Sequence, residues 1–257
     1  MKRNRIFWIS SIIVIGTILS FWSSTFADYR VLWDISHGGN PYIDYQPSGK
    51  FQPLVQNLAV HGFNVDTSIQ GFLVDDPTGY DVLVVCLGSA FYSSYSSEEV
   101  NRIADFVNNG GGLLIMGDNP VVPNVDIQPV ASAFGVTLGQ SMILPYDTYT
   151  SNLASHPIFD GVNEIYMRAA GEISAVTFSN EVAWQEGTGK ALVAVGAYGN
   201  GRVVTLGDIN LWAETEYYDL VDNRIFSINT FEYLAIPEPS TLLMIGLGAL
   251  FLRRKRR

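Results

Sequence analysis

Two short, uninterrupted apolar runs constrain the fold of this chain more than any other feature. Residues 82–87 read VLVVCL, and residues 112–116 read GLLIM. Runs of this kind are typical of strands buried on both faces of a parallel sheet. Between them, Ser96 and Glu99 have the spacing of a capping box that opens a helix, and the glycines at 110–111 end it. Strand, helix and strand in this order predict a parallel sheet with right-handed crossovers.

The same alternation continues on both sides of this unit. The expected elements are strands at 29–34 and 63–67, helices at 51–61, 125–134 and 219–234, and an antiparallel hairpin of residues 191–198 and 202–206. In the last helix, the inner face is expected to carry Leu220, Ile225, Ile228 and Phe231. The pattern predicts a flavodoxin-like, three-layer α/β domain with a mostly parallel sheet and a C-terminal antiparallel hairpin.

The N-terminus predicts a secretory signal peptide. Three basic residues among the first five precede an apolar stretch at 6–21, and small residues lead to Ala27. Signal peptidase is therefore expected to remove residues 1–27 and leave Asp28 as the first residue of the mature chain. An uncleaved N-terminal anchor is the alternative.

The C-terminus has three parts in a defined order. Pro237, Glu238 and Pro239 form a short hinge, an apolar run covers residues 241–252, and residues 253–257 are all basic. As a helix, the 12 residues of the run extend roughly 18 Å, against about 30 Å of hydrocarbon in a bilayer. The run alone is a marginal span, and the basic end is expected to stay on the cytoplasmic side.

These three parts closely resemble the PEP-CTERM sorting signal of Gram-negative bacteria. The resemblance implies export, recognition by an exosortase, cleavage near the motif after a transient stay in the inner membrane, and delivery to the cell surface or extracellular matrix. An ordinary C-terminal anchor is the alternative. The expected organisation is a signal peptide at 1–27, an ectodomain at 28–235 and a sorting signal at 236–257.

The charge of the ectodomain limits its partners. The chain has 15 basic and 25 acidic residues; without the two terminal segments, 7 basic and 24 acidic residues remain, a net charge of −17. Such a domain should repel nucleic acid and anionic lipid, whereas divalent cations or an extracellular polysaccharide are compatible with it. No other cofactor is expected. Because Cys86 is the only cysteine, no internal disulfide forms.

Several motifs of the ectodomain are similar to those of the class I glutamine amidotransferase-like fold. They are VLWD and SHG within residues 31–38, YDVLVVCLG at 80–88, EEVNRIADFVNNGGGLLIMGD at 98–118, HPI at 156–158 and YGNGRVVTLGD at 198–208. The resemblance implies that fold. It also implies a nucleophile on the tight turn after the strand at 112–116, where a thiolate would be activated.

That turn reads Gly117-Asp118-Asn119-Pro120, so neither cysteine nor serine stands at the matching position. Cys86 is followed by leucine and glycine, as at an amidotransferase nucleophile, but it lies inside an apolar strand. A buried cysteine more often behaves as a small hydrophobic residue.

Polar residues that follow the expected strands are the candidate ligand-binding site. Ligands of open α/β sheets bind at the carboxyl ends of the strands. The candidates are Asp34, Ser36, His37, Asp118, Asn119, Asp208 and Asn210. The alternative is that they cap helices and satisfy loop backbones. The other two histidines, His61 and His156, are read as a helix-end residue and a loop residue.

Aromatic residues in expected loops form a second group suited to sugar rings. They are Tyr42, Tyr45, Phe91, Tyr92, Tyr95, Tyr146, Tyr149, Trp212, Tyr217 and Tyr218. No metal-binding motif is present: Asp75-Asp76 lacks the spacing of a calcium loop, and neither HExxH nor a cysteine cluster occurs.

The favoured function is that of a non-enzymatic surface or matrix protein that binds carbohydrate or another envelope component near His37. The alternative is a hydrolase that acts on an extracellular glycan or peptide through Asp34, His37, Asp118 or Asp208. A purely structural role is a third reading.

Overall fold

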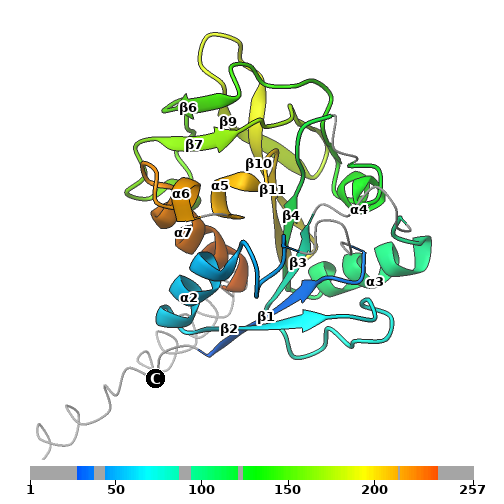
Figure 1. The fold of residues 1–257 in the computed structure, drawn as a ribbon. Helices are drawn as coiled ribbons and strands as arrows, with labels where there is room; N and C mark the ends of the chain where they lie inside the picture. Colours follow the sequence, from blue (N-terminus) through cyan, green and yellow to red (C-terminus); the bar gives the residue numbers. More distant parts are fainter. Residues whose placement is uncertain (1–27, 38–43, 87–93, 121–123, 214, 237–257) are drawn as a thin grey trace, which may run out of the picture.

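A seven-stranded sheet in the order β2–β1–β3–β4–β11–β10–β9 forms the centre of the computed structural model (Figure 1). The structure describes residues 28–37, 44–86, 94–120, 124–213 and 215–236. The strands are β1 (Tyr29–Asp34), β2 (Phe63–Ser68), β3 (Val82–Cys86), β4 (Gly112–Met116), β9 (Ser179–Trp184), β10 (Ala191–Tyr198) and β11 (Gly201–Leu206). Strands β2, β1, β3, β4 and β11 are parallel to their neighbours in this series, and β10 is antiparallel to β11 and β9.

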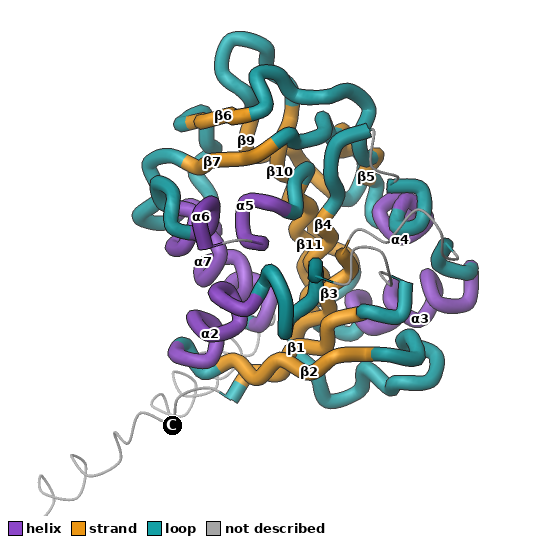
Figure 2. The backbone as a smooth tube through the Cα atoms, in the orientation of Figure 1, coloured by secondary structure: helices purple, strands orange, loops and turns teal. Residues whose placement is uncertain are grey.

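Helices cover both faces of the sheet (Figure 2). One face carries α2 (Gln52–Val60), α5 (Asn210–Ala213), α6 (Thr215–Tyr218) and α7 (Asn223–Ala235), and the other carries α3 (Ser97–Asn108) and α4 (Gln128–Ala133). The strand order reverses between β1 and β3, because the connection through α2 leads to one side and the connection through α3 to the other. Such a switch point opens a crevice at the carboxyl ends of the strands.

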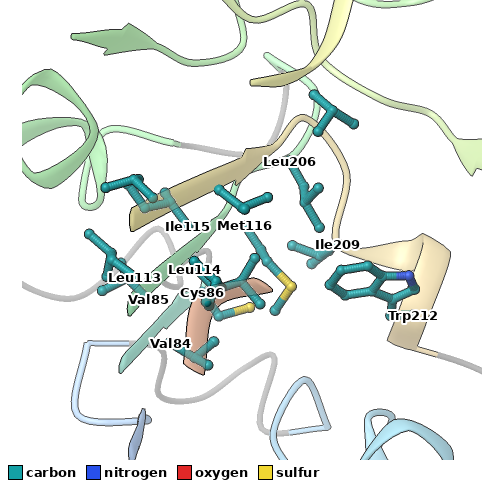
Figure 3. Packing of buried hydrophobic residues seen from close by; sticks show 14 of the residues in the cluster. Val84, Val85, Cys86, Leu113, Leu114, Ile115, Met116, Leu206, Ile209 and Trp212 are labelled. Carbon is teal, nitrogen blue, oxygen red and sulfur yellow. The ribbon is translucent and has the colours of Figure 1, made fainter. Parts of the chain in front are cut away.

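The apolar runs are buried as their composition predicts. Every residue of β3 and β4 is buried, because helices pack on both faces of these central strands. Figure 3 shows side chains of β3, β4 and β11 meeting Ile209 and Trp212 in one cluster. Cys86 belongs to this cluster and is 6% exposed. It therefore packs as a core residue at the end of β3, as expected.

Short elements connect β4 to the hairpin of β10 and β11. Two small antiparallel sheets form from β5 (Val136–Thr137) with β8 (Ser174–Ala175), and from β6 (Asp147–Thr150) with β7 (Ile165–Arg168). A single 3-10 turn, η1 (Pro157–Phe159), packs near α7. Among the residues described, no helix combines the length and apolar character that a membrane span requires.

The expected α/β domain with a mostly parallel sheet is confirmed, and three details differ. The hairpin is part of the main sheet, since β11 lies between β4 and β10. Helix α4 begins at Gln128, three residues later than expected, with a proline in its first turn, where proline is favoured. Helix α7 begins at Asn223, because Val221 has a φ of 42°, which interrupts a helix.

The predicted inner face of the last helix was partly wrong. Ile225 is 44% exposed, whereas Phe226 is completely buried. Ile228 and Phe231 are buried as predicted, and Leu220 is half-buried and precedes α7. The error is therefore confined to Ile225, whose neighbour Phe226 faces the core in its place. The signal peptide, the residues 237–239 and the tail that follows lie outside the described residues.

Candidate functional site

The seven predicted site residues lie at the carboxyl edge of the sheet in two separate groups. Asp34, Ser36 and His37 are at the end of β1, and the others follow β4 and β11: Asp118, Asn119, Asp208 and Asn210. Strand β3 separates β1 from β4, and two strand spacings amount to about 10 Å. Among the described residues, no hydrogen bond or ion pair joins the two groups, so they form two separate sites.

The first group is a histidine cluster made of Asp34, Ser36, His37, Tyr95 and Glu99. The Nδ1 of His37 lies 2.7 Å from Oδ2 of Asp34, and its Nε2 lies 3.2 Å from Oε1 of Glu99. The imidazole also stacks on the ring of Tyr95, with the centroids 3.8 Å apart. His37 is thus bonded at both nitrogens and covered on one face.

Asp34 is bonded at both of its carboxylate oxygens. The backbone N–H and the hydroxyl of Ser36 donate to Oδ1, at 2.9 and 2.7 Å. His37 and the hydroxyl of Tyr95 donate to Oδ2. Burial by itself would raise the pKa of Asp34, but these hydrogen bonds and the charge of His37 lower it below its usual value.

The same arrangement favours the protonated form of His37. Burial by itself lowers the pKa of the imidazole, but the hydrogen bond and charge of Asp34 and the charge of Glu99 raise it above its usual value. An imidazolium donates from both nitrogens and has no lone pair left to accept a proton. The hydroxyl of Ser36 is 2.9 Å from Nδ1, but His37 in this state cannot activate it as a base.

Glu99 and Tyr95 are the members of this cluster whose contacts sequence reasoning missed. The Oε2 of Glu99 closes the capping box of α3 with Ser96, as predicted, while Oε1 reaches His37. The capping motif explains only the first of these contacts. Gly71, with a φ of +80°, brings its loop over the cluster, and a Cβ there would lie 3.1 Å from Oε1 of Glu99.

The second group contains a carboxyl pair formed by Asp118 and Asp208. Asp208 is completely buried; its Oδ2 accepts from the backbone N–H of Arg168 at 2.7 Å, and its Oδ1 accepts from the N–H of Asn210 at 2.7 Å. Oδ1 of Asp118 accepts from the backbone and side chain of Asn119, at 2.7 and 3.0 Å. Neighbouring amides therefore hold both carboxyl groups in place.

The pKa is raised for both members of the pair, by burial at Asp118 and by burial and charge repulsion at Asp208. Burial raises the pKa of Asp118 to about 6, although the hydrogen bonds from Asn119 lower it. Burial and the negative charge of Asp118 raise the pKa of Asp208 to about 8. Two nearby carboxyl groups in a buried site disfavour each other's ionisation, so their titrations are coupled. Near neutral pH, Asp208 holds the proton and Asp118 is mostly ionised.

Asn124 holds the turn after β4 in the shape that positions Asp118. Its Oδ1 accepts from the N–H of Asp118 at 2.9 Å, and its Nδ2 donates to the carbonyl of Asp118, also at 2.9 Å. Sequence reasoning missed both Asn124 and Arg168. For Asn124, the available signal was an asparagine after the proline-containing turn. The contact of Arg168 depends on the pairing of β7, which the sequence did not predict.

The remaining candidates have structural surroundings. The Nδ1 of His61 lies 2.9 Å from the carbonyl of Asn57, and His156 caps η1. Of the described aromatic candidates, Tyr95, Trp212 and Tyr218 are buried, whereas Tyr146 and Tyr149 are 52% and 46% exposed. Within the described part of the chain, no three His, Cys, Asp or Glu side chains are grouped to hold a metal ion. The divalent cation stays a prediction.

A family model for a domain of unknown function, DUF4350, matches residues 54–229. The chain belongs to the DUF4350 family. The match covers the whole second group and, from the histidine cluster, Tyr95 and Glu99. The three residues at the end of β1 precede the match. No curated protein matches the chain.

Solved structures share the fold of this DUF4350 domain. The N-terminal domain of mmIFT52 has a TM-score of 0.66 at 11% identity and covers 80% of this chain and 97% of its own. A cytoplasmic protein from Salmonella typhimurium LT2 has a TM-score of 0.61 at 18% identity, over 81% and 100%. A ThuA-like protein from Bacteroides uniformis has 0.54 at 15% identity, over 80% and 91%. These similarities confirm the expected amidotransferase-like fold and show the fold alone.

The C-terminal segment matches the PEP-CTERM protein-sorting motif at residues 235–257. The recognition of Pro237, Glu238 and Pro239 as part of that signal is confirmed. The motif implies that the protein is exported, processed by an exosortase and sorted to the cell surface.

Proposed function

We propose that this protein is a surface or extracellular-matrix protein whose DUF4350 domain binds carbohydrate or another envelope component without catalysing a reaction. The observation that carries the proposal is the bonding of His37, whose two nitrogens are engaged by Asp34 and Glu99. A general base needs a free lone pair within reach of the proton that it removes. The histidine at the switch point has none in its protonated form.

The turn after β4 supports the same conclusion. In the amidotransferase-like fold the nucleophile is expected here, and this chain has Asp118 and Asn119 in its place. Neither side chain is an activated thiol or hydroxyl. A domain that lacks both a nucleophile at this turn and a free base at β1 is better suited to binding than to acyl transfer.

The proposal is tested by assaying the purified full chain for both binding and hydrolysis. We expect binding on an array of bacterial glycans and envelope polymers, and no turnover of ester, amide or glycoside substrates. We expect no turnover by the His37→Gln variant either. Turnover that disappears in His37→Gln would show that the histidine is catalytic and would overturn the proposal.

Export and sorting are tested separately from binding. The proposed mature ectodomain begins at Asp28, after removal of residues 1–27 by signal peptidase, and ends near residue 235. N-terminal sequencing of the surface form checks the first boundary. Replacing Pro237, Glu238 and Pro239 with alanine should leave the protein in the inner membrane, as measured by fractionation. Unchanged release from these cells would contradict exosortase processing.

The carboxyl pair favours a second candidate function, hydrolysis of an extracellular glycan or peptide. Asp118 and Asp208 have pKa values of about 6 and about 8, and carboxyls with separated pKa values commonly divide the roles of base and acid. In this reading Asp118 activates a water molecule, and the buried Asp208, which is protonated near neutral pH, adds no negative charge that would oppose the ionisation of Asp118. A hydrolytic activity that rises with pH through about 6 and is lost in Asp118→Asn would favour this candidate.

A further inference from the structure

A pocket lies at the opposite edge of the sheet from both groups. It has a volume of about 430 Å³ and is formed by the residues that precede β3 and β4, the last turns of α3 and the end of α7. This volume is within the range of small-ligand sites, about 300–1,000 Å³. We call it the amino-edge pocket.

Two aromatic rings line the amino-edge pocket in fixed positions. The guanidinium of Arg30 lies 4.1 Å from the ring centroid of Tyr80, and the hydroxyl of Tyr80 donates to Asp66 at 3.1 Å. The ring of Phe106 lies directly on Gly111, where a Cβ would approach it to 2.1 Å. Both rings are half-buried and held by contacts within the protein. They provide preformed apolar surface without a loss of side-chain freedom on binding.

Polar groups surround these rings on one face of α3. Arg102, Asp105 and Asn109 follow each other at helical spacing and all line the pocket. Arg102 is held by Asp76, with 2.7 Å between the guanidinium nitrogen and Oδ1. The amide of Asn109 donates to the carbonyl of Asp105 at 2.8 Å, so the side-chain amide is oriented as well.

The chemistry of these groups identifies the class of ligand. A pyranose ring has an apolar face of C–H groups and a rim of hydroxyls that both donate and accept hydrogen bonds. Aromatic rings match the face, and carboxylate, amide and guanidinium groups match the rim. An anionic ligand would be repelled by two carboxylates of the pocket, Asp81 and Asp105, and by the strongly acidic ectodomain.

We propose that the amino-edge pocket binds a neutral saccharide of one or two hexose units, stacked on Tyr80 or Phe106 and hydrogen-bonded to Asp105. The site goes beyond the proposed function, because it is at the edge of the sheet away from His37. It does not require that the carboxyl edge bind anything.

The test is saturation-transfer NMR and calorimetry on the full chain in a detergent without a sugar head group. The probes are glucose, galactose, mannose, N-acetylglucosamine, cellobiose and maltose. We expect at least one to bind with a dissociation constant on the order of 1 mM or below. Asp105→Asn should weaken that binding about tenfold, which corresponds to about 1.4 kcal/mol. Arg102→Gln is a second variant of the same rim.

Glu98→Gln is the matched control, since it changes a charge on the same helix outside the pocket, and it should bind as the unmodified chain does. Loss of binding in Tyr149→Ala or Asp118→Asn, with Asp105→Asn unaffected, would overturn the pocket and leave the proposed binding function intact. Failure of all six sugars to bind at about 20 mM, roughly twenty times the highest dissociation constant expected, would also overturn it. Spermidine is a further probe. Its binding in place of the sugars would identify a cation site and overturn the saccharide proposal.

Discussion

At the end of β1 two carboxylates enclose one histidine, whereas at the ends of β4 and β11 two carboxylates act on each other. The opposite charges of the first group lower the pKa of Asp34 and raise that of His37, which favours the ionised form of both. In the second group burial raises the pKa of Asp118, and burial together with the charge of Asp118 raises the pKa of Asp208. Similar residue types at one sheet edge thus have opposite electrostatic states.

This difference separates a group that is held in its ionised state from a pair that titrates near neutral pH. A buried ion pair with all its hydrogen bonds made is a rigid part of the fold. A carboxyl pair with raised pKa values contains a group that titrates close to neutral pH, which is a property common at functional sites. The residue types at the strand ends therefore do not distinguish the ion pair from the carboxyl pair. The partners of each side chain distinguish them.

The largest effect is expected from breaking the histidine cluster. His37→Ala leaves the buried carboxylate of Asp34 and the partly buried carboxylate of Glu99 without their cation, and the loss of one partner from a buried pair costs about 3–5 kcal/mol. Urea unfolding of the variant and of the unmodified chain measures this loss. His61→Ala is the control, because His61 is exposed and bonds a backbone carbonyl. Equal unfolding free energies for both variants would contradict the structural role of His37.

The pH dependence of stability sharpens the same comparison. Because the pKa of His37 is raised in the folded state, its stabilisation is complete below about pH 6.5 and is lost as the pH rises through the folded pKa. Asp126 also interacts with His37. Burial raises the pKa of Asp126, although the charge of the imidazolium lowers it. We expect the stability difference between the unmodified chain and His37→Gln to shrink as the pH rises. A difference that grows with pH would contradict the assignment.

The carboxyl pair is tested by removing one of its charges. Asp118→Asn keeps an oxygen that can accept from Asn119 and removes the repulsion that acts on Asp208. The pKa of Asp208 should fall from about 8 by roughly one unit. Carbon-13 NMR of the carboxyl carbons follows this titration directly. An unchanged value would mean that burial alone raises the pKa of Asp208.

Much of the fold could be predicted from the sequence, because its signals are local. The apolar runs of β3 and β4, the capping box of α3 and the glycine turn between β10 and β11 each depend on residues close in the chain. The place of β11 beside β4 depends on a pairing of residues 90 positions apart in the chain, such as Gly112 with Arg202, and no local pattern specifies it. The hairpin was therefore predicted, but not its insertion into the main sheet.

The candidate site was predictable only as a set of strand ends. Asp34 and His37 are three residues apart, so their contact follows from a local turn. Glu99 and Tyr95 reach them from the other side of the β1–β3 switch point, and the sequence contains no signal for that approach. For the same reason, the repulsion between Asp118 and Asp208 could not be foreseen from their positions after two distant strands.

The smallest effect is expected from Ser96→Ala, which separates the two roles of Glu99. The hydroxyl of Ser96 accepts from the N–H of Glu99 at the start of α3, and loss of such a cap costs about 1 kcal/mol. Because Oε1 of Glu99 still faces His37, this loss should be the same at every pH. Urea unfolding at about pH 6 and about pH 9, on either side of the usual histidine pKa, measures it. A loss that appears only at the lower pH would mean that the cap and the histidine cluster form one unit, and the two contacts of Glu99 would not be separable.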